Sequence, residues 1–415
     1  MSKVVKANYT AEAVAGFTHR TAIEEAARCL LCHDAPCSKG CPAGTDPAKF
    51  IRSIRFRNAK GAAETIRENN ILGGTCARVC PYDRLCEEAC SRCGIDRPIE
   101  IGKLQRYAIE QEEAFGMKTL QAGEAKEGKV ACIGAGPASL AAAAELRKAG
   151  YEVTIFEKEA KAGGVLTYGI VPSRLPQAVV DHDIAMVEAL GVKFEFNKKV
   201  EIADVEDFDA IFVGTGLWGT KLPEIPGTDL KGVYAAADYL KAARTTGAQD
   251  GKKVVVVGGG DVAVDCAVTA KLLGAEDVRI VYRRTLEEAP GNMTEFQYAL
   301  SLGIGMTTNM APAAIEGNGS VEFMSFTGRE GVLDGAELKL ACDTVVFAIG
   351  QKAEEVAGVA LTEKGTVAAE EGKTNVAKVF AAGDIVNGGK TVVEAVAAGK
   401  EAAAAIVAYL EKGVK

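Results

Sequence analysis

Cysteine is distributed very unevenly along this 415-residue chain, because nine of its twelve cysteines fall between residues 29 and 93. They form two groups with short spacings, and each group contains a Cys-Pro pair. Structural zinc sites usually combine two close pairs, often with histidine, whereas dense runs of this kind gather thiolates around iron–sulfur clusters. The segment therefore predicts two 4Fe–4S clusters, with zinc as the alternative. The groups are Cys29, Cys32, Cys37 and Cys41, and Cys76, Cys80, Cys86, Cys90 and Cys93.

Length and composition are those of a protein with about two to four domains. The chain is 48% apolar and 25% charged, and its net charge of −8 is spread without a basic stripe, which argues against nucleic acid as a partner. No apolar run approaches the ~18 residues of a membrane span, and the first residues lack the apolar core of a signal peptide. We therefore expect a cytoplasmic protein, whose cysteines serve as metal ligands or catalytic groups rather than disulfides.

The N-terminal part reads as helical throughout. Segments 18–31, 46–58 and 59–70 have helical character, and nothing before residue 125 resembles a strand. We expect a small all-α domain over residues 1–125 that holds the two clusters and gains much of its stability from them. The polar segment 118–129 suits a linker.

Two strand–turn–helix–strand units follow, one starting at residue 130 and the other at residue 253. Their strands are continuous Val/Ile-rich runs, as in buried parallel sheets. In the first unit, Gly134 permits a tight turn and Gly136 lets backbone N–H groups approach a pyrophosphate at a helix N-terminus. Ser139 replaces the third glycine of the fingerprint, and Glu157 stands where an acid would bond a ribose hydroxyl. Further candidate contacts are Pro137, Ala138, Lys158, Gly164 and Val165.

The second unit carries a different signal at the end of its second strand. Arg283 and Arg284 stand there in place of an acid, and arginine suits a 2′-phosphate. NADPH is therefore the first choice for this site, and NADH stays open. The turn itself comprises Gly258, Gly260, Asp261, Val262 and Ala263.

Later segments complete the pattern of a flavoprotein. Strands 211–216 and 346–350 both end in glycine, the second at Gly350. A further strand ends at Gly383-Asp384, whose carboxylate would accept from ribityl hydroxyls. Thr391 and Val392 open the last helix, whose N-terminus would stabilise negative charge on a reduced flavin.

These motifs predict an α/β fold: an N-terminal all-α iron–sulfur domain followed by two Rossmann-like nucleotide-binding domains, similar to glutathione reductase. We expect a discontinuous FAD domain over residues 126–250 and 346–415, and an inserted NAD(P)H domain over residues 251–345.

The chain resembles the electron-input subunits of bacterial NAD-dependent dihydropyrimidine dehydrogenases. The resemblance covers essentially the whole chain and includes DPAKFIRSI, GAAETIRENN, ARVCP, IGKLQRY and AAGDIVNGGKTVVEAV. Glutamate synthase small subunits are related. The resemblance implies one cluster held by Cys29, Cys32, Cys37 and Cys90. It implies a second cluster held by Cys41, Cys80, Cys86 and the side chain of Gln105, which leaves Cys76 and Cys93 without a role.

The same resemblance implies FAD at the first turn, the nicotinamide cofactor at the second, and Arg174 near the flavin. The partner would be a TIM-barrel subunit with FMN and further 4Fe–4S clusters, where uracil and thymine are reduced to their 5,6-dihydro forms. The implied activity is NAD(P)H oxidation with electron export, which fits the lack of a candidate acid, base or nucleophile because the cofactors carry the chemistry.

Three alternatives stay open to different degrees. A glutamate synthase small subunit or an NAD(P)H:ferredoxin-type subunit belongs to the same class, and its relatives tend to carry an acid at the Gln105 position. A disulfide reductase with a zinc-stabilised N-terminus would need a C-x-x-C motif in the second nucleotide domain, which contains only Cys266 and Cys342. A nucleotide-sensing scaffold would show no hydride transfer. We expect Cys132, Cys266 and Cys342 to be packing residues.

Overall fold

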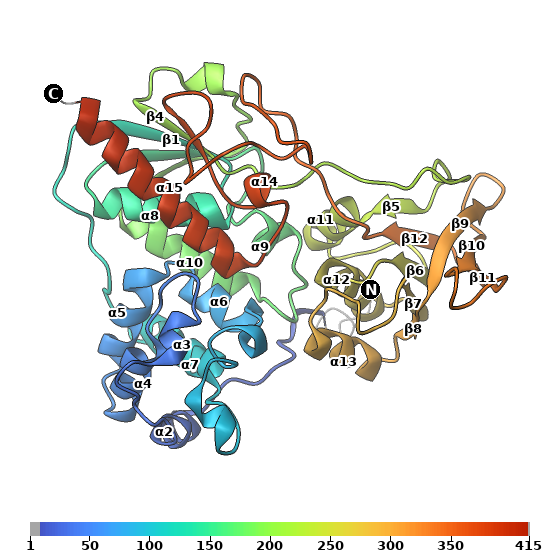
Figure 1. Cartoon of the computed structure of the whole chain (residues 1–415), viewed down its shortest axis with the longest axis horizontal. Coiled ribbons are helices and arrows are strands. Elements are labelled where there is room, and N and C mark those ends of the chain that lie inside the picture. Colours follow the sequence, from blue (N-terminus) through green and yellow to red (C-terminus); the bar gives the residue numbers. More distant parts are fainter. Residues whose placement is uncertain (1–8, 414–415) are drawn as a thin grey trace. The chain divides into compact units, whose positions relative to one another are not determined.

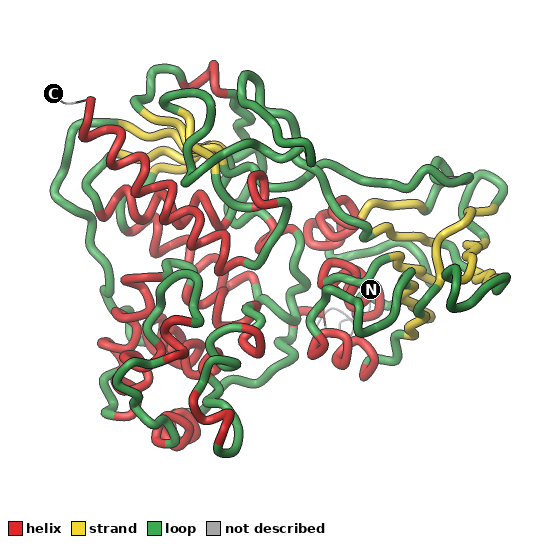
Figure 2. The backbone as a smooth tube through the Cα atoms, in the orientation of Figure 1, coloured by secondary structure: helices red, strands yellow, loops and turns green. Residues whose placement is uncertain are grey.

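The computed structural model describes residues 9–413. They form two compact units, each built around a five-stranded parallel sheet. The larger unit comprises residues 14–167, 177–217 and 353 onward, and the smaller unit comprises the described residues up to Ala13 together with Tyr168–Pro176 and Trp218–Lys352. Figure 1 labels many of the elements of both units, and Figure 2 colours their helices and strands differently.

The larger unit begins with a helical part that contains no strand among its described residues, as the sequence predicts. The helices expected over 18–31, 46–58 and 59–70 are confirmed as α2, α4 and α5. Thr18 and Asp46 cap α2 and α4 by accepting backbone N–H bonds, which explains where these helices start. The elements are α2 (His19–Ala27), α3 (Pro36–Lys39), α4 (Pro47–Arg55), α5 (Ala59–Asn69), α6 (Gly73–Val79), the 3-10 turns η1 (Tyr82–Arg84) and η2 (Ser91–Gly94), and α7 (Ile101–Ala114).

The sheet of the larger unit has the strand order β13-β4-β1-β2-β3, with every pairing parallel. Its central strands are buried along most of their length, which accounts for their unbroken apolar sequences. Helix α15 packs along α8, and the two run side by side in Figure 1. The elements are β1 (Lys129–Ile133), α8 (Pro137–Lys148), β2 (Glu152–Phe156), α9 (Val165–Tyr168), α10 (Gln177–Ala189), β3 (Lys193–Glu195), η3 (Ile202–Val205), β4 (Ala210–Val213), β13 (Val379–Ala381), α14 (Asp384–Asn387) and α15 (Val392–Gly413).

The smaller unit repeats this topology with the order β5-β12-β6-β7-β8 and adds an antiparallel sheet, β11-β10-β9. The antiparallel sheet is not predicted from the sequence. The elements are β5 (Val233–Ala235), α11 (Ala236–Thr246), β6 (Lys253–Val257), α12 (Asp261–Leu272), β7 (Asp277–Val281), α13 (Met293–Ser301), β8 (Gly305–Thr307), β9 (Met310–Glu316), β10 (Phe323–Gly328), β11 (Glu337–Ala341) and β12 (Thr344–Phe347).

The limits of the smaller unit differ from the boundaries expected at 251 and 345. Strand β5 and helix α11 precede residue 251, yet β5 pairs in parallel with β12 and so belongs to this sheet. The backbone hydrogen bonds of β5, which the sequence pattern does not reveal, are the physical reason. The α/β fold with two Rossmann-like sheets is confirmed, and no described helix is long and apolar enough to cross a membrane.

Candidate functional site

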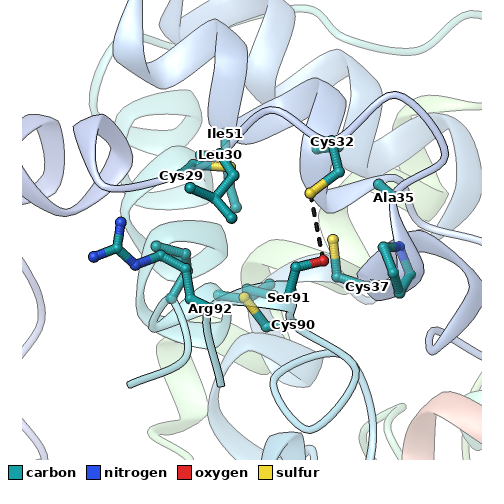
Figure 3. Close-up of a pocket in the computed structure, with 13 residues that line it drawn as sticks. Cys29, Leu30, Cys32, Ala35, Cys37, Ile51, Cys90, Ser91 and Arg92 are labelled. Atoms are coloured by element: carbon teal, nitrogen blue, oxygen red, sulfur yellow. Dashed lines mark hydrogen bonds between the residues drawn. The ribbon is translucent and has the colours of Figure 1, made fainter. Parts of the chain in front are cut away.

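Four cysteines line one open cavity in the helical part of the larger unit (Figure 3). We call Cys29, Cys32, Cys37 and Cys90 the first cysteine set. They come from the loop after α2, from α3 and from the residue before η2. Apolar side chains complete the wall, and the Cys32 thiol donates a hydrogen bond to Ser91 Oγ at 3.4 Å. Folding thus brings together, around one space, the thiols that the resemblance groups as ligands of one cluster.

Burial and crowding disfavour the ionised form of the thiols in the first cysteine set. Burial raises the pKa of the Cys37 thiol to about 11, and the neighbouring Cys90 and Cys29 thiols add to the effect. Burial also raises the pKa of Cys29, again with its neighbouring thiols contributing. Crowded thiols resist ionisation because their negative charges repel, whereas bound iron favours the thiolates. Four thiols around one cavity are the ligand set of a 4Fe–4S cluster, so the residues present fit such a cluster.

The second cysteine set comprises Cys41, Cys80 and Cys86, which follow α3, α6 and η1 respectively. The pKa of Cys80 is raised well above its ordinary range by a hydrogen bond with Cys76, by burial, and by the nearby Cys86 and Cys41 thiols. Burial raises the pKa of Cys86 too, with Glu87 and Cys41 contributing. The three thiols therefore lie within electrostatic range of one another, and Cys76 lies among them.

Gln105, the predicted fourth ligand of the second cluster, is buried in α7. Its Nε2 donates to the backbone oxygen of Gly73 at 2.8 Å. Gly73 opens α6, the helix that ends directly before Cys80, so this bond ties Gln105 to the helix that leads into the second cysteine set. Because the amide nitrogen is engaged, the amide oxygen is the atom available to a metal.

The other cysteines divide by burial. Cys93 is exposed, and its thiol donates to the backbone oxygen of Glu87 at 3.3 Å. Cys132, Cys266 and Cys342 are buried in apolar cores, which confirms them as packing residues. Among the described residues, no three His, Cys, Asp or Glu side chains converge on a single metal ion. A 4Fe–4S cube does not require such convergence, because each ligand binds a different iron.

The first glycine turn lies where three backbone segments meet. Gly134 has φ +90°, and a Cβ on it would lie 2.9 Å from the backbone oxygen of Gly214, just after β4. A Cβ on Gly164 would lie 3.1 Å from Gly136 Cα, and one on Gly383 would lie 2.8 Å from Ala138 Cβ. Only residues without side chains permit this approach. The turn opens α8 at Pro137, so the N-terminus of that helix, whose first N–H groups have no partner within the helix, lies at this turn.

The polar groups near this turn differ in their hydrogen bonding and burial. Glu157 accepts from the backbone N–H of Ala135 at 2.8 Å, so its carboxylate lies against the turn. Ser139 is buried, and its hydroxyl has no hydrogen-bond partner among the described residues. Lys158 is exposed and lies 3.4 Å from Glu354, while Val165 opens α9 and is 37% exposed.

The C-terminal segment reaches the same turn. Burial raises the pKa of Asp384, whose Oδ1 accepts from the backbone N–H of Lys390 at 3.1 Å. Thr391 caps α15 by exchanging bonds with Glu394, and Val392 is the first residue of that helix. Of this segment, Gly383 lies beside the first turn, because a Cβ on it would lie 2.8 Å from Ala138 Cβ.

The second turn repeats the first in the smaller unit. A Cβ on Gly258 would lie 2.5 Å from the backbone oxygen of Ala348, which follows β12, and Gly260 stands before α12 with almost open space beside it. Asp261 accepts from the backbone N–H of Asn292 at 2.6 Å. Of the other predicted contacts, Val262 is 37% exposed, Ala263 is buried, and Gly350 borders open space.

Arg283 and Arg284 lie just beyond β7 and are exposed. Neither guanidinium forms an ion pair with any described residue. Both cations are therefore available to a ligand phosphate near the second turn. Strand β7 ends at the buried residue Val281, and the two arginines follow where the chain leaves the sheet.

Arg174, expected beside the flavin, forms ion pairs with two carboxylates of the smaller unit. Its guanidinium lies 3.1 Å from Asp265 and 3.7 Å from Glu295. Burial raises the pKa of Asp265 to about 7, although Arg174 acts in the opposite direction. Two long-range features were not predicted from the sequence: the buried group of Arg67, Glu112 and Asp183, and Lys400, which reaches the helical part from α15. No local pattern marks either.

Comparison with family models assigns both halves of the chain. Residues 6–117 match dihydropyrimidine dehydrogenase domain II, 4Fe-4S cluster, and residues 128–399 match pyridine nucleotide-disulphide oxidoreductase. The NAD-dependent dihydropyrimidine dehydrogenase subunit PreT of Escherichia coli is 47% identical over 97% of this chain and 98% of its own length. The glutamate synthase [NADPH] small chain of the same organism is 32% identical over 95% of this chain and 93% of its own.

Solved structures agree on the fold. FprA from Mycobacterium tuberculosis, in complex with NADPH, matches with a TM-score of 0.61 at 18% identity, over 70% of this chain and 86% of its own. Thioredoxin reductase from Lactococcus lactis matches with a TM-score of 0.57 at 21% identity, over 69% of this chain and all of its own. The domain matches make the chain a pyridine-nucleotide-dependent oxidoreductase with FAD and 4Fe–4S clusters as cofactors. With two glycine turns, two gathered cysteine sets and relatives that match over nearly their full length, this chain belongs to the family of NAD-dependent dihydropyrimidine dehydrogenase subunits within the pyridine nucleotide-disulphide oxidoreductases.

Proposed function

We propose that this chain is the electron-input subunit of a cytoplasmic dihydropyrimidine dehydrogenase. It would oxidise NADH or NADPH and deliver the electrons to a TIM-barrel partner with FMN and 4Fe–4S clusters, which reduces uracil or thymine. One observation carries the proposal: the four thiols of the first cysteine set line a single cavity, in a chain 47% identical over nearly its full length to a dihydropyrimidine dehydrogenase subunit.

The two cysteine sets would hold the clusters. Cys29, Cys32, Cys37 and Cys90 surround the first cavity, and Cys41, Cys80 and Cys86 would share the second cluster with the Gln105 oxygen. An amide ligand is neutral, so a cluster with three thiolates and one amide carries one negative charge fewer than a cluster with four thiolates. Net cluster charge is one of the quantities that set a reduction potential. The two sets therefore differ in a way that suits sequential electron carriers.

The first turn would hold FAD. The N-terminus of α8 offers backbone N–H groups to the pyrophosphate, and the Glu157 carboxylate, fixed by Ala135, is placed to accept a ribose hydroxyl. When bound, FAD supplies the conversion of a two-electron hydride into single electrons. The N-terminus of α15 and its Thr391 cap would favour negative charge near the isoalloxazine.

The second turn would hold the nicotinamide cofactor. The N-terminus of α12 follows Gly260, where almost nothing fills the position of a side chain. Arg283 and Arg284 would lie toward the adenosine ribose, where guanidinium groups bind a 2′-phosphate. The 47% relative is named NAD-dependent, so NADH remains an alternative donor for this chain.

A two-step experiment tests the proposal. The anaerobically purified chain is mixed with NADH or NADPH, and bleaching of the flavin absorbance is followed. The proteins that copurify with it are then identified, and nucleotide oxidation by the complex is measured with uracil or thymine. We expect flavin bleaching by the chain alone and pyrimidine-dependent turnover by the complex. An unbleached flavin would exclude hydride input, and a complex that forms glutamate from glutamine and 2-oxoglutarate would indicate the glutamate synthase alternative.

A further inference from the structure

We propose that Lys400 is a positioning residue that sets the reduction potential of the cluster held by the second cysteine set. The ammonium group would raise that potential and would fix the loop behind Cys41 against helix α15. This inference rests on the proposed function, because it takes a 4Fe–4S cluster to be bound by Cys41, Cys80 and Cys86.

Lys400 joins two parts of the larger unit that are far apart in the sequence. It lies in α15, which packs along α8 of the sheet. Its Nζ donates to the backbone oxygen of Ala43 at 2.6 Å and to that of Asn69 at 2.7 Å. Ala43 stands two residues after Cys41, and Asn69 ends α5. One ammonium therefore holds both the loop that carries a predicted cluster ligand and the end of a neighbouring helix.

The end of α5 and the start of α6 form further hydrogen bonds with side chains of α8 and α10. Lys148, at the end of α8, donates to the backbone oxygen of Glu68 at 3.0 Å. Asp183, in α10, accepts from the backbone N–H of Thr75 at 2.7 Å. Lys400 differs from both because only it also bonds to the loop behind Cys41. Of these three side chains, Lys400 is therefore the one bonded to a loop of the second cysteine set.

The positive charge of Lys400 is not neutralised by direct pairing. Both of its acceptors are neutral carbonyl oxygens, and no described carboxylate lies within ion-pair distance of it. Glu145, which interacts with it electrostatically, is itself paired with Lys148 at 2.7 Å. Lys400 also interacts electrostatically with the Cys41 thiol. A half-buried cation thus lies within electrostatic range of a predicted cluster ligand, and no described anion is in contact with it.

The direction of the effect follows from charge. Reduction adds one negative charge to a cluster, so a nearby cation stabilises the reduced state more than the oxidised state. Screening by salt is weaker for a half-buried group than for an exposed one. Charge and hydrogen bonding around the sulfurs are recognised determinants of cluster potential. Lys400 would therefore make the second cluster a better acceptor of electrons from the flavin.

The test measures potentials and needs neither nucleotide nor partner. Redox titration of the full chain with mediators, followed by electron paramagnetic resonance, gives the midpoint of each cluster. Lys400→Gln keeps an N–H donor and removes the charge, Lys400→Arg keeps the charge, and Lys412→Gln changes an exposed lysine of the same helix. The Cys86→Ser chain identifies which signal belongs to the second cluster.

We expect Lys400→Gln to lower the ratio of reduced to oxidised second cluster about tenfold at a fixed potential, a shift of about 59 mV. Lys400→Arg and Lys412→Gln should match the wild type, and the first cluster should not move. Loss of the second cluster from Lys400→Gln, with retention at wild-type potential in Lys400→Arg, would also support a role for the charge.

Three results would overturn the inference: an unchanged midpoint in Lys400→Gln, an equal shift in Lys400→Arg, or equal loss of the cluster from both. Failure of the proposed function looks different. A wild-type chain that carries no second cluster, or whose flavin is not reduced by pyridine nucleotide, contradicts that proposal before any variant is compared.

Discussion

The carboxylate of Asp183, in α10, lies 2.6 Å from the guanidinium of Arg67, in α5, and both side chains are fully buried. The same carboxylate accepts backbone N–H bonds at the start of α6, and Arg67 also pairs with Glu112 of α7 at 2.7 Å. One buried group of charged side chains therefore joins α5, α6 and α7 to α10. These helices position the second cysteine set and Gln105.

Removing one member of this group should destabilise the larger unit. Asp183→Asn leaves Arg67 with only Glu112 as its anionic partner and weakens the cap of α6. Breaking a buried ion pair from one side costs about 3–5 kcal/mol. Denaturant unfolding of the cofactor-loaded chain measures the change. Asp181→Asn, at an exposed position of the same helix, serves as the control and should stay within about 0.5 kcal/mol of the wild type. Equal stability of the two variants would show that the pair contributes nothing net.

The two cysteine sets predict separable losses of iron. The wild-type chain, purified anaerobically, should carry about eight iron and eight sulfide per chain. Cys90→Ser opens the first set and Cys86→Ser the second, so each should retain about four iron. The control is Cys93→Ser, three residues from Cys90 but exposed and outside both sets, which should keep both clusters. Iron loss from Cys93→Ser, or stoichiometric zinc in the wild type, would contradict the assignment.

Gln105 offers a sharper test of the second cluster. Gln105→Ala removes both the amide oxygen and the bond to Gly73. We expect a damaged second cluster with a shifted potential, normal FAD content, and intact flavin reduction with slower electron export. Glu110→Ala, on the same helix and paired with Arg78 at 2.9 Å, is a suitable control and should leave both cluster signals in place. If both cluster signals and electron export survive the loss of Gln105, the residue serves only as packing.

Much of the fold follows from the sequence because its determinants are local. Gly134 must adopt φ +90° and must pass a neighbouring backbone oxygen closely, so glycine marks the turn unambiguously. Capping residues such as Thr18 and Asp46 likewise fix helix starts from within a few positions. The cysteine spacings identify a cluster segment for the same reason.

The remaining features depend on contacts between distant residues. Arg67 and Asp183 are 116 positions apart, and each stands in an ordinary helical pattern, so only the folded chain reveals the pair. Lys400 lies in an alanine-rich helix where a lysine reads as solvated surface, yet its partners are 357 and 331 positions away. Strand β5 joins its sheet through a three-residue pairing too short to leave a pattern. Gln105 is predicted as a ligand only through the family resemblance. A single glutamine has no characteristic sequence spacing to the cysteines that would mark it as a metal ligand.

Asp265 predicts a pH dependence of stability in the smaller unit. Burial raises its pKa from about 3.8 to about 7, with Glu295 and Asp261 adding to the rise and Arg174 opposing it. Because the folded form binds the proton more tightly, the stability from this group is fully present below pH 3.8 and is lost as the pH rises through 7.

Asp265→Asn replaces this carboxyl with a neutral group of similar shape. The stability of the variant relative to wild type should therefore rise between about pH 4 and about pH 7 and level off above that range. The ion pair with Arg174 forms only with the ionised carboxyl, so its contribution is already contained in the pKa of about 7 and in this slope. Urea unfolding at several pH values measures it, with Asp238→Asn, an exposed carboxylate of the same unit, as the control. A difference that stays flat with pH would mean that Asp265 is ionised in the folded chain throughout.

Arg283 and Arg284 predict which nucleotide the second turn distinguishes. Both guanidinium groups are exposed beyond β7 and have no described ion-pair partner. Charge-assisted hydrogen bonds to a dianionic 2′-phosphate contribute roughly 1.5–3 kcal/mol, or about one to two decades in affinity. The double change to alanine should therefore raise the KM for NADPH by that factor and the KM for NADH much less.

Stopped-flow reduction of the flavin by each nucleotide separates binding from later electron transfer. Lys252→Ala is the matched control, because Lys252 precedes β6 whereas the turn follows that strand. A wild type that prefers NADH is compatible with this prediction, since the variant is compared with its parent for each nucleotide. If instead the double variant loses affinity for both nucleotides equally, the arginines bind the shared pyrophosphate. If neither KM changes, they do not face the nucleotide at all.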